Sequence, residues 1–114
     1  MCLWAEQLFS GLETVSYTHL ASKGGIAQLT KALSNEWMSK GINVNAIAPG
    51  YMDTDMNSAL MNDNKRNDEI LSRIPAKRWG TADDMKGLTI FLSSDASDYI
   101  SGAVITCDGG YLCR

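Results

Sequence analysis

Lys23 is the residue whose neighbours point most clearly to chemistry. It stands at the start of a predicted helix, directly before Gly24 and Gly25. Two glycines in a first helical turn lower helix propensity, so we expect another group to approach the backbone there. The residue four positions before Lys23, one helical turn away, is His19, and the nearest tyrosine, Tyr17, lies six positions before it. An acid–base pair would need an acidic hydroxyl one turn before the lysine, and this spacing supplies the lysine without the hydroxyl.

Three elements are expected to position this lysine. A helix is predicted over residues 22–40, with Gly41 in the left-handed position after its end. Its apolar residues follow helical spacing: Ile26, Leu29, Leu33 and Trp37. A buried strand is predicted over residues 42–48, and the turn at Pro49 and Gly50 ends it. A helix, a buried strand and a tight turn in this order are typical of half of a nucleotide-dependent redox site.

The remainder of the chain contains fewer strong patterns. Residues 51–66 form a polar excursion rich in Met and Asn. Three further elements are expected after it: a helix at about 64–73 that ends before Pro75, a helix at about 82–94 that is capped by Thr81, and a strand over 103–107. Residues 108–110, Asp-Gly-Gly, are interpreted as a turn.

Length and element order predict the fold class. With 114 residues the chain forms at most one domain, and 45% hydrophobic and 20% charged residues are enough for a core. Each of the two predicted strands follows a helix, so they should pair in parallel. Parallel sheets are covered on both faces and are seldom this small, and the sequence has no G-x-G-x-x-G phosphate turn. We therefore expect an α/β fold, namely the truncated C-terminal part of a doubly wound Rossmann-type parallel sheet.

Composition argues against several other classes of function. The formal net charge is −3 and the pI about 4.9, so neither a nucleic acid nor an anionic membrane surface is expected as a partner. Three cysteines without paired spacing predict reduced thiols, with neither a disulfide framework nor a metal site. No apolar run approaches the roughly 18 residues of a membrane span. The first residues also lack the features of a signal peptide, so we expect a cytoplasmic protein.

Several motifs in order resemble the C-terminal half of a short-chain dehydrogenase/reductase. They cover about residues 21–114 and include Ala-Ser-Lys-Gly-Gly at 21–25, Asn-Ala-Ile-Ala-Pro-Gly at 45–50, Arg-Ile-Pro-Ala-Lys-Arg-Trp-Gly at 73–80 and Asp-Gly-Gly at 108–110. Within that family, the runs Ala-Pro-Gly-Tyr-Met and Asp-Gly-Gly-Tyr-Leu-x-Arg are most similar to the 2-dehydro-3-deoxy-D-gluconate 5-dehydrogenase (2-deoxy-D-gluconate 3-dehydrogenase) group. Gluconate 5-dehydrogenases and 3-oxoacyl carrier-protein reductases share much of the same pattern.

The resemblance implies an NAD(P)-dependent oxidoreductase that acts on the hydroxyl/ketone pair of a small sugar acid. In the family, a tyrosine one turn before the lysine is the general acid/base, and the lysine lowers its pKa and holds the nicotinamide ribose. Lys23 would be that lysine. Pro49 and Gly50 would face the cofactor, Met52 would offer its backbone to the nicotinamide amide, and Thr54 would reach the cofactor phosphates.

The resemblance also carries expectations about surroundings and partners. Residues 51–75 would form a mobile lid over the substrate. NAD is favoured over NADP as the cofactor, and the intact family member would be a homo-oligomer that contacts its partners through the regions corresponding to 22–40 and 82–107. Arg78 could bind the carboxylate of a sugar acid, although a structural ion pair is favoured. Trp79 is expected to be a packing residue.

The pattern departs from the family at its N-terminal edge. In one alignment His19 takes the place of the tyrosine. In the other, His19 and Leu20 are inserted, and the insertion rotates Tyr17 by about 200° around a helix, away from Lys23. Residues 1–20 are therefore interpreted as an atypical, non-native N-terminus, and residues 21–114 as the C-terminal half of the family's domain. We expect little or no turnover, and a non-catalytic oligomerisation module is the alternative function.

Overall fold

The computed structural model describes residues 16–113, with side chains from Ala21 onward. In chain order, its helices and strands are α1 (Ser16–Trp37), β1 (Ala46–Pro49), α2 (Ser58–Asn62), α3 (Asn64–Arg73), α4 (Ala82–Leu92) and β2 (Val104–Cys107). Four single turns of 3₁₀ helix connect or follow them: η1 (Met38–Lys40), η2 (Asp55–Asn57), η3 (Asp95–Ser97) and η4 (Tyr111–Cys113). For residues 1–15, the expectation of an atypical N-terminus lies outside the described residues.

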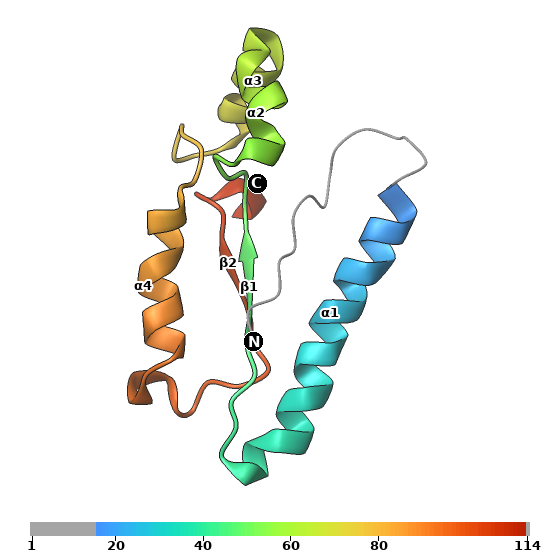
Figure 1. Ribbon diagram of the computed structural model, residues 1–114, viewed down its shortest axis with the longest axis vertical. Helices are drawn as coiled ribbons and strands as arrows, with labels where there is room; N and C mark the ends of the chain where they lie inside the picture. The colour runs from blue at the N-terminus through green and yellow to red at the C-terminus, as the bar shows by residue number, and fades with distance from the viewer. Residues whose placement is uncertain (1–15, 114) are drawn as a thin grey trace.

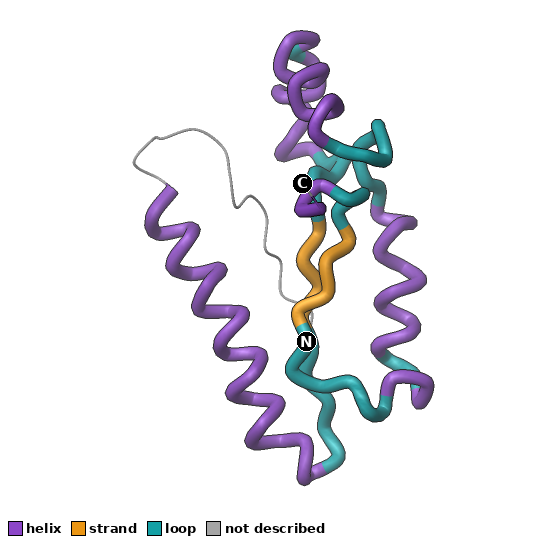
Figure 2. The backbone as a smooth tube through the Cα atoms, turned by 180° about the vertical axis from the view of Figure 1, so that it is seen from behind, coloured by secondary structure: helices purple, strands orange, loops and turns teal. Residues whose placement is uncertain are grey.

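The two strands pair in parallel, and in both views they lie between α1 and α4 (Figure 1, Figure 2). The register joins Ala46 to Val104 and Pro49 to Cys107. Both strands point toward α2 and α3, which lie beyond the carboxyl ends of the strands (Figure 1). The predicted α/β class and the parallel pairing are confirmed, and the polar excursion after β1 contains η2 and α2.

Helix α1 begins earlier than the sequence pattern predicts, at Ser16 and not at residue 22. The helix extends over the less favourable residues 16–20, because extending a helix is far easier than nucleating one. Among the described residues, none lies within 4 Å of the point where a Cβ would stand at Gly24 or Gly25, so the expected close approach is not observed there. At the other end, Gly41 adopts the predicted left-handed conformation with φ 76°.

Strand β1 begins later than predicted, at Ala46, and side-chain bonds supplement a single backbone bond before it, from the Gly102 N–H to the Val44 carbonyl at 2.7 Å. The Asn45 Nδ2 atom donates to the Ile100 carbonyl at 2.7 Å, and its Oδ1 atom accepts from the Ala103 N–H at 3.1 Å. The Val44 N–H donates to Ser101 Oγ at 3.1 Å. These bonds hold the two strand entries side by side before the backbone ladder begins.

The buried core lies around the two strands, and its apolar members are Val44, Ala46, Ile47, Met52, Ile74 and Trp79. Helix α1 contacts this core through small polar residues. Its buried Ser34 donates to Ser101 Oγ at 2.7 Å. Gly102, with φ 79°, makes this approach possible, because a Cβ there would stand 3.1 Å from Ser34 Oγ. The absence of a side chain at Gly102 therefore allows α1 to pack on the strand entries.

The two longer helices after β1 begin at the predicted positions, and each begins after a capping residue. Asp63 caps α3 and accepts hydrogen bonds from the Lys65 and Arg66 N–H groups at 3.1 and 3.2 Å. Thr81 and Asp84 form a capping box at the start of α4, which ends two residues before its predicted end. No helix within residues 16–113 combines the length and apolar character needed to cross a membrane.

Candidate functional site

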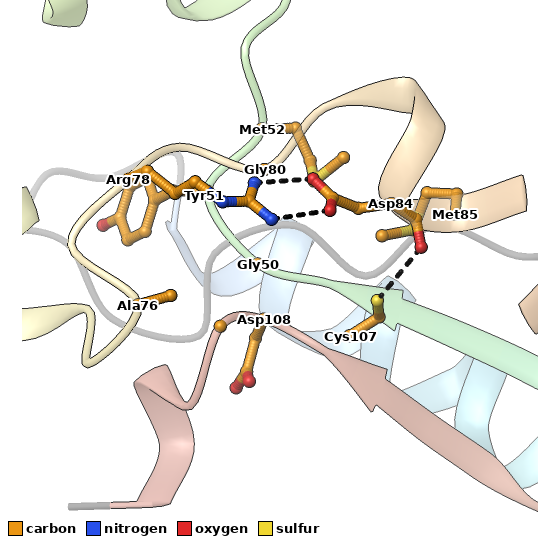
Figure 3. A pocket seen from close by; sticks show the side chains of 11 residues that line it. Gly50, Tyr51, Met52, Ala76, Arg78, Gly80, Asp84, Met85, Cys107 and Asp108 are labelled. Carbon is orange, nitrogen blue, oxygen red and sulfur yellow. Dashed lines mark hydrogen bonds and ion pairs between the residues drawn. The ribbon is translucent and has the colours of Figure 1, made fainter. Parts of the chain in front are cut away.

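A hollow of about 240 Å³ opens at the carboxyl ends of β1 and β2 (Figure 3). Three parts of the chain line it: the turn after β1, the loop and helix start between residues 76 and 85, and the end of β2. In open α/β sheets, ligands bind at this edge of the sheet. Gly50 and Met52, two of the sequence-predicted cofactor residues, are in the lining. This hollow is therefore the candidate site.

Gly50 allows the two strand ends to touch. Its N–H donates to the Cys107 carbonyl at 3.0 Å, one bond beyond the end of β1. A Cβ on Gly50 would stand 2.6 Å from Asp108 Cα and 2.8 Å from Asp108 Cβ, which is closer than real side chains come. Pro49 is buried at the last position of β1. The turn therefore ends the strand and presents backbone, with no side chain at Gly50, to the hollow.

A second parallel bridge joins Met52 to Gly80 and closes one side of the hollow. The Gly80 N–H donates to the Tyr51 carbonyl at 2.8 Å, and the Asp53 N–H donates to the Gly80 carbonyl at 2.7 Å. Met52 lies between these bonds, so its own backbone groups point away from Gly80. Its carbonyl accepts from Asn57 Nδ2 at 2.8 Å, whereas its N–H has no acceptor among the described residues. A buried residue of the lining thus carries an unused backbone donor.

The remaining sequence-predicted residues do not line the hollow. Thr54 is half-buried, and its hydroxyl accepts from Asn57 Nδ2 at 3.4 Å. Lys23 is half-buried on α1, and the described lining includes no residue of that helix. His19 and Tyr17 belong to the same helix, at four and six positions before Lys23. The structure thus brings Gly50 and Met52 together and leaves Lys23 apart. Within residues 16–113, no cluster of His, Cys, Asp or Glu could hold a metal ion.

Arg78 and Asp84 form a bidentate ion pair in the lining of the hollow, with both N–O distances at 2.7 Å (Figure 3). Thr81 adds hydrogen bonds to the same carboxylate from its N–H at 2.7 Å and from its hydroxyl at 3.0 Å. The Arg78 bond, followed by those of Thr81, holds the pKa of the Asp84 carboxyl well below its usual range. The favoured prediction of a structural ion pair at Arg78 is confirmed.

The end of β2 carries two side chains that serve the local structure. Cys107 Sγ donates to the Asp84 carbonyl at 3.7 Å (Figure 3). Burial, followed by the charges of Asp84 and Asp108, raises the pKa of the Cys107 thiol, so the thiol stays protonated and unreactive. The Asp108 carboxylate accepts from the Gly110 N–H at 2.8 Å and from the Leu112 N–H at 3.0 Å. The interpretation of residues 108–110 as a turn is confirmed.

Sequence reasoning missed a cluster of aromatic residues beside the hollow. The Tyr51 ring lies edge-on to Trp79 at 5.6 Å and to Tyr111 at 5.3 Å, and Arg73 lies over the Tyr111 ring at 5.0 Å. Trp79 is 8% exposed and donates from Nε1 to Asn67 Oδ1 at 2.7 Å, which confirms its packing role. Burial, then the neighbouring Tyr111, raises the pKa of Tyr51, and the Arg73 charge opposes this shift. Each aromatic residue belongs to or directly follows a recognised motif, but nothing in the linear pattern indicates that the three meet.

Comparison with known proteins places this geometry among dehydrogenases. A family model described as enoyl-(acyl carrier protein) reductase matches residues 10–112. The chain is 57% identical over 96 residues to a 2-dehydro-3-deoxy-D-gluconate 5-dehydrogenase of Pseudoalteromonas atlantica; the match covers 84% of this chain and 38% of that protein. The chain therefore spans about two fifths of the length of the curated relatives that it matches.

Two solved structures share the fold of the chain at high sequence identity. A crystal structure assigned to a 2-deoxy-D-gluconate 3-dehydrogenase of Agrobacterium tumefaciens, with bound NADP, has a TM-score of 0.84 and 54% identity, covering 94% of this chain and 43% of that one. A structure assigned to an NAD(P)-dependent gluconate 5-dehydrogenase of Beutenbergia cavernae, with NADP bound at low occupancy, has a TM-score of 0.88 and 45% identity. It covers 99% of this chain and 45% of that one.

The contact between Gly50 and Asp108 leads to a stability prediction. We expect Gly50→Ala to lower the free energy of unfolding by about 1–3 kcal/mol, because the new methyl group meets backbone that cannot move aside. Gly87→Ala in α4 is the matched control: no described atom lies within 4 Å of its Cβ position, and helix propensity predicts a gain of about 1 kcal/mol. Urea unfolding measures both variants. Equal changes in the free energy of unfolding in the two variants would contradict the close contact between Gly50 and Asp108.

The low pKa of Asp84 predicts an acid dependence of stability. A carboxyl whose folded pKa is depressed contributes stability above the pKa of the unfolded aspartate, about 3.9, and that contribution is lost as the pH falls toward the folded pKa. Asp84→Asn should therefore be less stable than the unmodified chain at neutral pH, with the difference shrinking below about pH 4. Urea midpoints across this pH range test it.

Asp83→Asn is the control for this prediction. It removes only an exposed ion pair with Lys86, in the same helical turn, and should follow the acid dependence of the unmodified chain. A stability difference between the Asp84→Asn variant and the unmodified chain that stays constant from neutral pH to about pH 2 would count against the Arg78 ion pair as its source.

Proposed function

The chain belongs to the short-chain dehydrogenase/reductase family, and we propose that residues 21–114 form the C-terminal half of an NADP-dependent dehydrogenase acting on a small sugar acid. The reaction is the interconversion of a hydroxyl and a ketone. The observation that carries this proposal is the 57% identity to a 2-dehydro-3-deoxy-D-gluconate 5-dehydrogenase. The lower identity of 45% to a gluconate 5-dehydrogenase makes that specificity the weaker candidate.

The choice of NADP follows from the solved relatives. Both structures described above contain NADP, and the preference for NAD implied by the family resemblance has no support from them. When bound, the nicotinamide accepts or donates the hydride. Two features of this chain fit such a group: the unused N–H of buried Met52, and Gly50, where backbone borders the hollow without a side chain.

The family resemblance gives the sequence-predicted residues the following roles, although Thr54 and Lys23 lie outside the lining. Met52 would donate its backbone N–H to the nicotinamide amide. Pro49 and Gly50 would keep side chains out of the path of the ring, and the Thr54 hydroxyl would donate toward the cofactor phosphates. Lys23 would hold the nicotinamide ribose with its ammonium group. These roles bind and orient the cofactor, and none of them moves a proton at the substrate.

We further propose that the chain has little or no turnover by itself. His19 stands one helical turn before Lys23, at the position where the family's acid–base tyrosine is found, and Tyr17 lies six positions before the lysine. Proton transfer therefore lacks its phenol. Measurable oxidation of 2-deoxy-gluconate by the purified chain with NAD or NADP would overturn this part of the proposal.

Cofactor binding tests the main proposal without requiring turnover. We expect calorimetric titration with NADP to give weak binding that Lys23→Ala reduces about tenfold, because a hydrogen bond from a charged group contributes about 1.5–3 kcal/mol. Lys31→Ala removes an exposed lysine from the same helix and should leave the affinity unchanged. Equal losses in both variants, or a chain that binds no NADP, would argue against the proposed role of Lys23.

Exposed apolar residues favour a second candidate function, non-catalytic assembly. Ile90 is 69% exposed and Phe91 37% exposed on α4, and Leu29 is 46% exposed on α1. Apolar surface of this kind favours association with another protein surface. The family resemblance relates the regions of α1 and α4 to oligomer interfaces, so a second copy of the chain is the proposed partner.

Sedimentation over a range of concentrations tests assembly. We expect the chain to self-associate, and Ile90→Ser to shift the equilibrium toward monomer because it removes exposed apolar area from α4. Met56→Ser is the matched control, since Met56 is 80% exposed but lies on η2, away from both helices. A chain that remains monomeric at all concentrations would exclude the assembly function.

A further inference from the structure

Arg73, Tyr51 and Tyr111 come together from three separate parts of the chain. Arg73 lies in the last turn of α3, Tyr51 follows Gly50, and Tyr111 begins η4. The Arg73 Cζ atom lies 5.0 Å from the centre of the Tyr111 ring, and the Tyr111 and Tyr51 rings lie 5.3 Å apart. Tyr51 also lines the hollow, on the side away from Cys107 (Figure 3). Tyr51 therefore joins the cluster to the candidate site, and Arg73 and Tyr111 lie behind it, outside the lining.

Two members of this cluster have unused hydrogen-bonding capacity. The Tyr111 hydroxyl is buried, and its interaction with the Tyr51 hydroxyl falls short of a well-formed hydrogen bond. The exposed Arg73 guanidinium stacks on the Tyr111 ring, and no described residue accepts a hydrogen bond from it. Buried hydroxyls normally find a partner, and a guanidinium carries five donors. The contrast with Arg78 is clear, because Arg78 commits both terminal nitrogens to Asp84.

Tyr51 connects these two groups. Burial and the neighbouring Tyr111 raise the pKa of the Tyr51 hydroxyl, so this hydroxyl keeps its proton and can donate it to an acceptor. The Arg73 guanidinium stacks on the Tyr111 ring, and that ring lies 5.3 Å from the Tyr51 ring, so the guanidinium and the Tyr51 phenol flank the same ring. An anion bound beside Arg73 would therefore also be within the influence of a phenolic donor.

We infer that Arg73, Tyr51 and Tyr111 form a carboxylate-binding subsite, an inference that rests on the proposed function because it names the group by which a sugar acid is recognised. Arg73 donates to the carboxylate from its exposed guanidinium. The Tyr51 hydroxyl donates to the same carboxylate, which leaves its oxygen free to accept from Tyr111 and completes the hydrogen bond between the two hydroxyls. Tyr111 is thus a positioning residue that acts through Tyr51.

The chemistry of the cluster favours a carboxylate over a neutral group. Hydrogen bonds between ionised partners are stronger than those between neutral ones, so an uncharged hydroxymethyl group would gain much less at Arg73. A chain of hydrogen bonds from Tyr111 through Tyr51 also strengthens the outermost donor. Because Tyr51 lines the hollow, a carboxylate held here leaves the carbon chain of the sugar acid in the volume of about 240 Å³ beside it.

Binding of D-gluconate, with D-glucitol as its neutral counterpart, tests the subsite on the purified chain. The two probes differ only in a carboxylate or a hydroxymethyl group at one end. Calorimetry or chemical-shift titration should give tighter binding of gluconate, and Arg73→Gln should weaken gluconate binding about tenfold while leaving glucitol unchanged. Arg66→Gln, an exposed arginine on the same helix α3, is the matched control and should change neither.

A second variant keeps the test independent of folding effects at Arg73. Tyr111→Phe keeps the ring on which Arg73 stacks and removes only the buried hydroxyl, so it should weaken gluconate binding about threefold without reducing thermal stability. A merely structural role of Tyr111 would change the affinity for both probes alike. The difference in affinity between gluconate and glucitol is therefore the informative quantity.

Three outcomes would overturn the subsite. These are gluconate binding no tighter than glucitol, no gluconate binding at all, and unchanged gluconate binding in both the Arg73→Gln and Tyr111→Phe variants. The NADP titration separates this failure from failure of the proposed function. NADP binding that depends on Lys23, together with any of these three outcomes, rejects the carboxylate subsite and leaves the dehydrogenase proposal standing.

Discussion

The arrangement of this chain depends on the parallel ladder between β1 and β2, which is only four residues long on each strand. Such a ladder is at the short end of the usual range, and the chain lengthens it by other means at both ends. Before the ladder, the Asn45 side chain bonds Ile100 and Ala103 as a backbone pair would. After it, the Gly50 N–H adds one more bond to Cys107. Because the register is fixed along this whole length, the two strands end together, and their ends form the hollow.

The polar groups around the hollow divide into two sets. Arg78, Asp84 and Asp108 are satisfied by bonds within the chain, and these bonds shape the loop, the helix start and the turn that line the hollow. The Met52 N–H is buried without a partner among the described residues, and the Tyr111 hydroxyl is buried without a well-formed hydrogen bond. An unsatisfied buried group destabilises a fold by about 1–3 kcal/mol, so the Met52 N–H, on a residue that lines the hollow, favours an external partner. The same reasoning makes Arg78 a structural residue and leaves Arg73 available for a ligand.

Local signals in the sequence predicted the helix ends and turns well. Gly41, Asp108 and the capping residue Thr81 each act through bonds within a few residues, and a linear pattern contains that information. The start of α1 was missed because helix extension overrides the low propensity of residues 16–20. The late start of β1 was missed because Asn45 bonds residues more than 50 positions away. The aromatic cluster escaped prediction for the same reason, since its members are distant in sequence and no periodicity connects them.

The continuity of α1 bears on the missing acid–base pair. The helix runs from Ser16 to Trp37 without a break, so two extra residues before Ala21 are not looped out and instead rotate everything that precedes them. The helical position one turn before Lys23 therefore belongs to His19 under either alignment, and no change of register brings Tyr17 there. Family membership is shown by the match over residues 10–112, whereas the proposed lack of proton transfer depends on a single helical position, which His19 occupies.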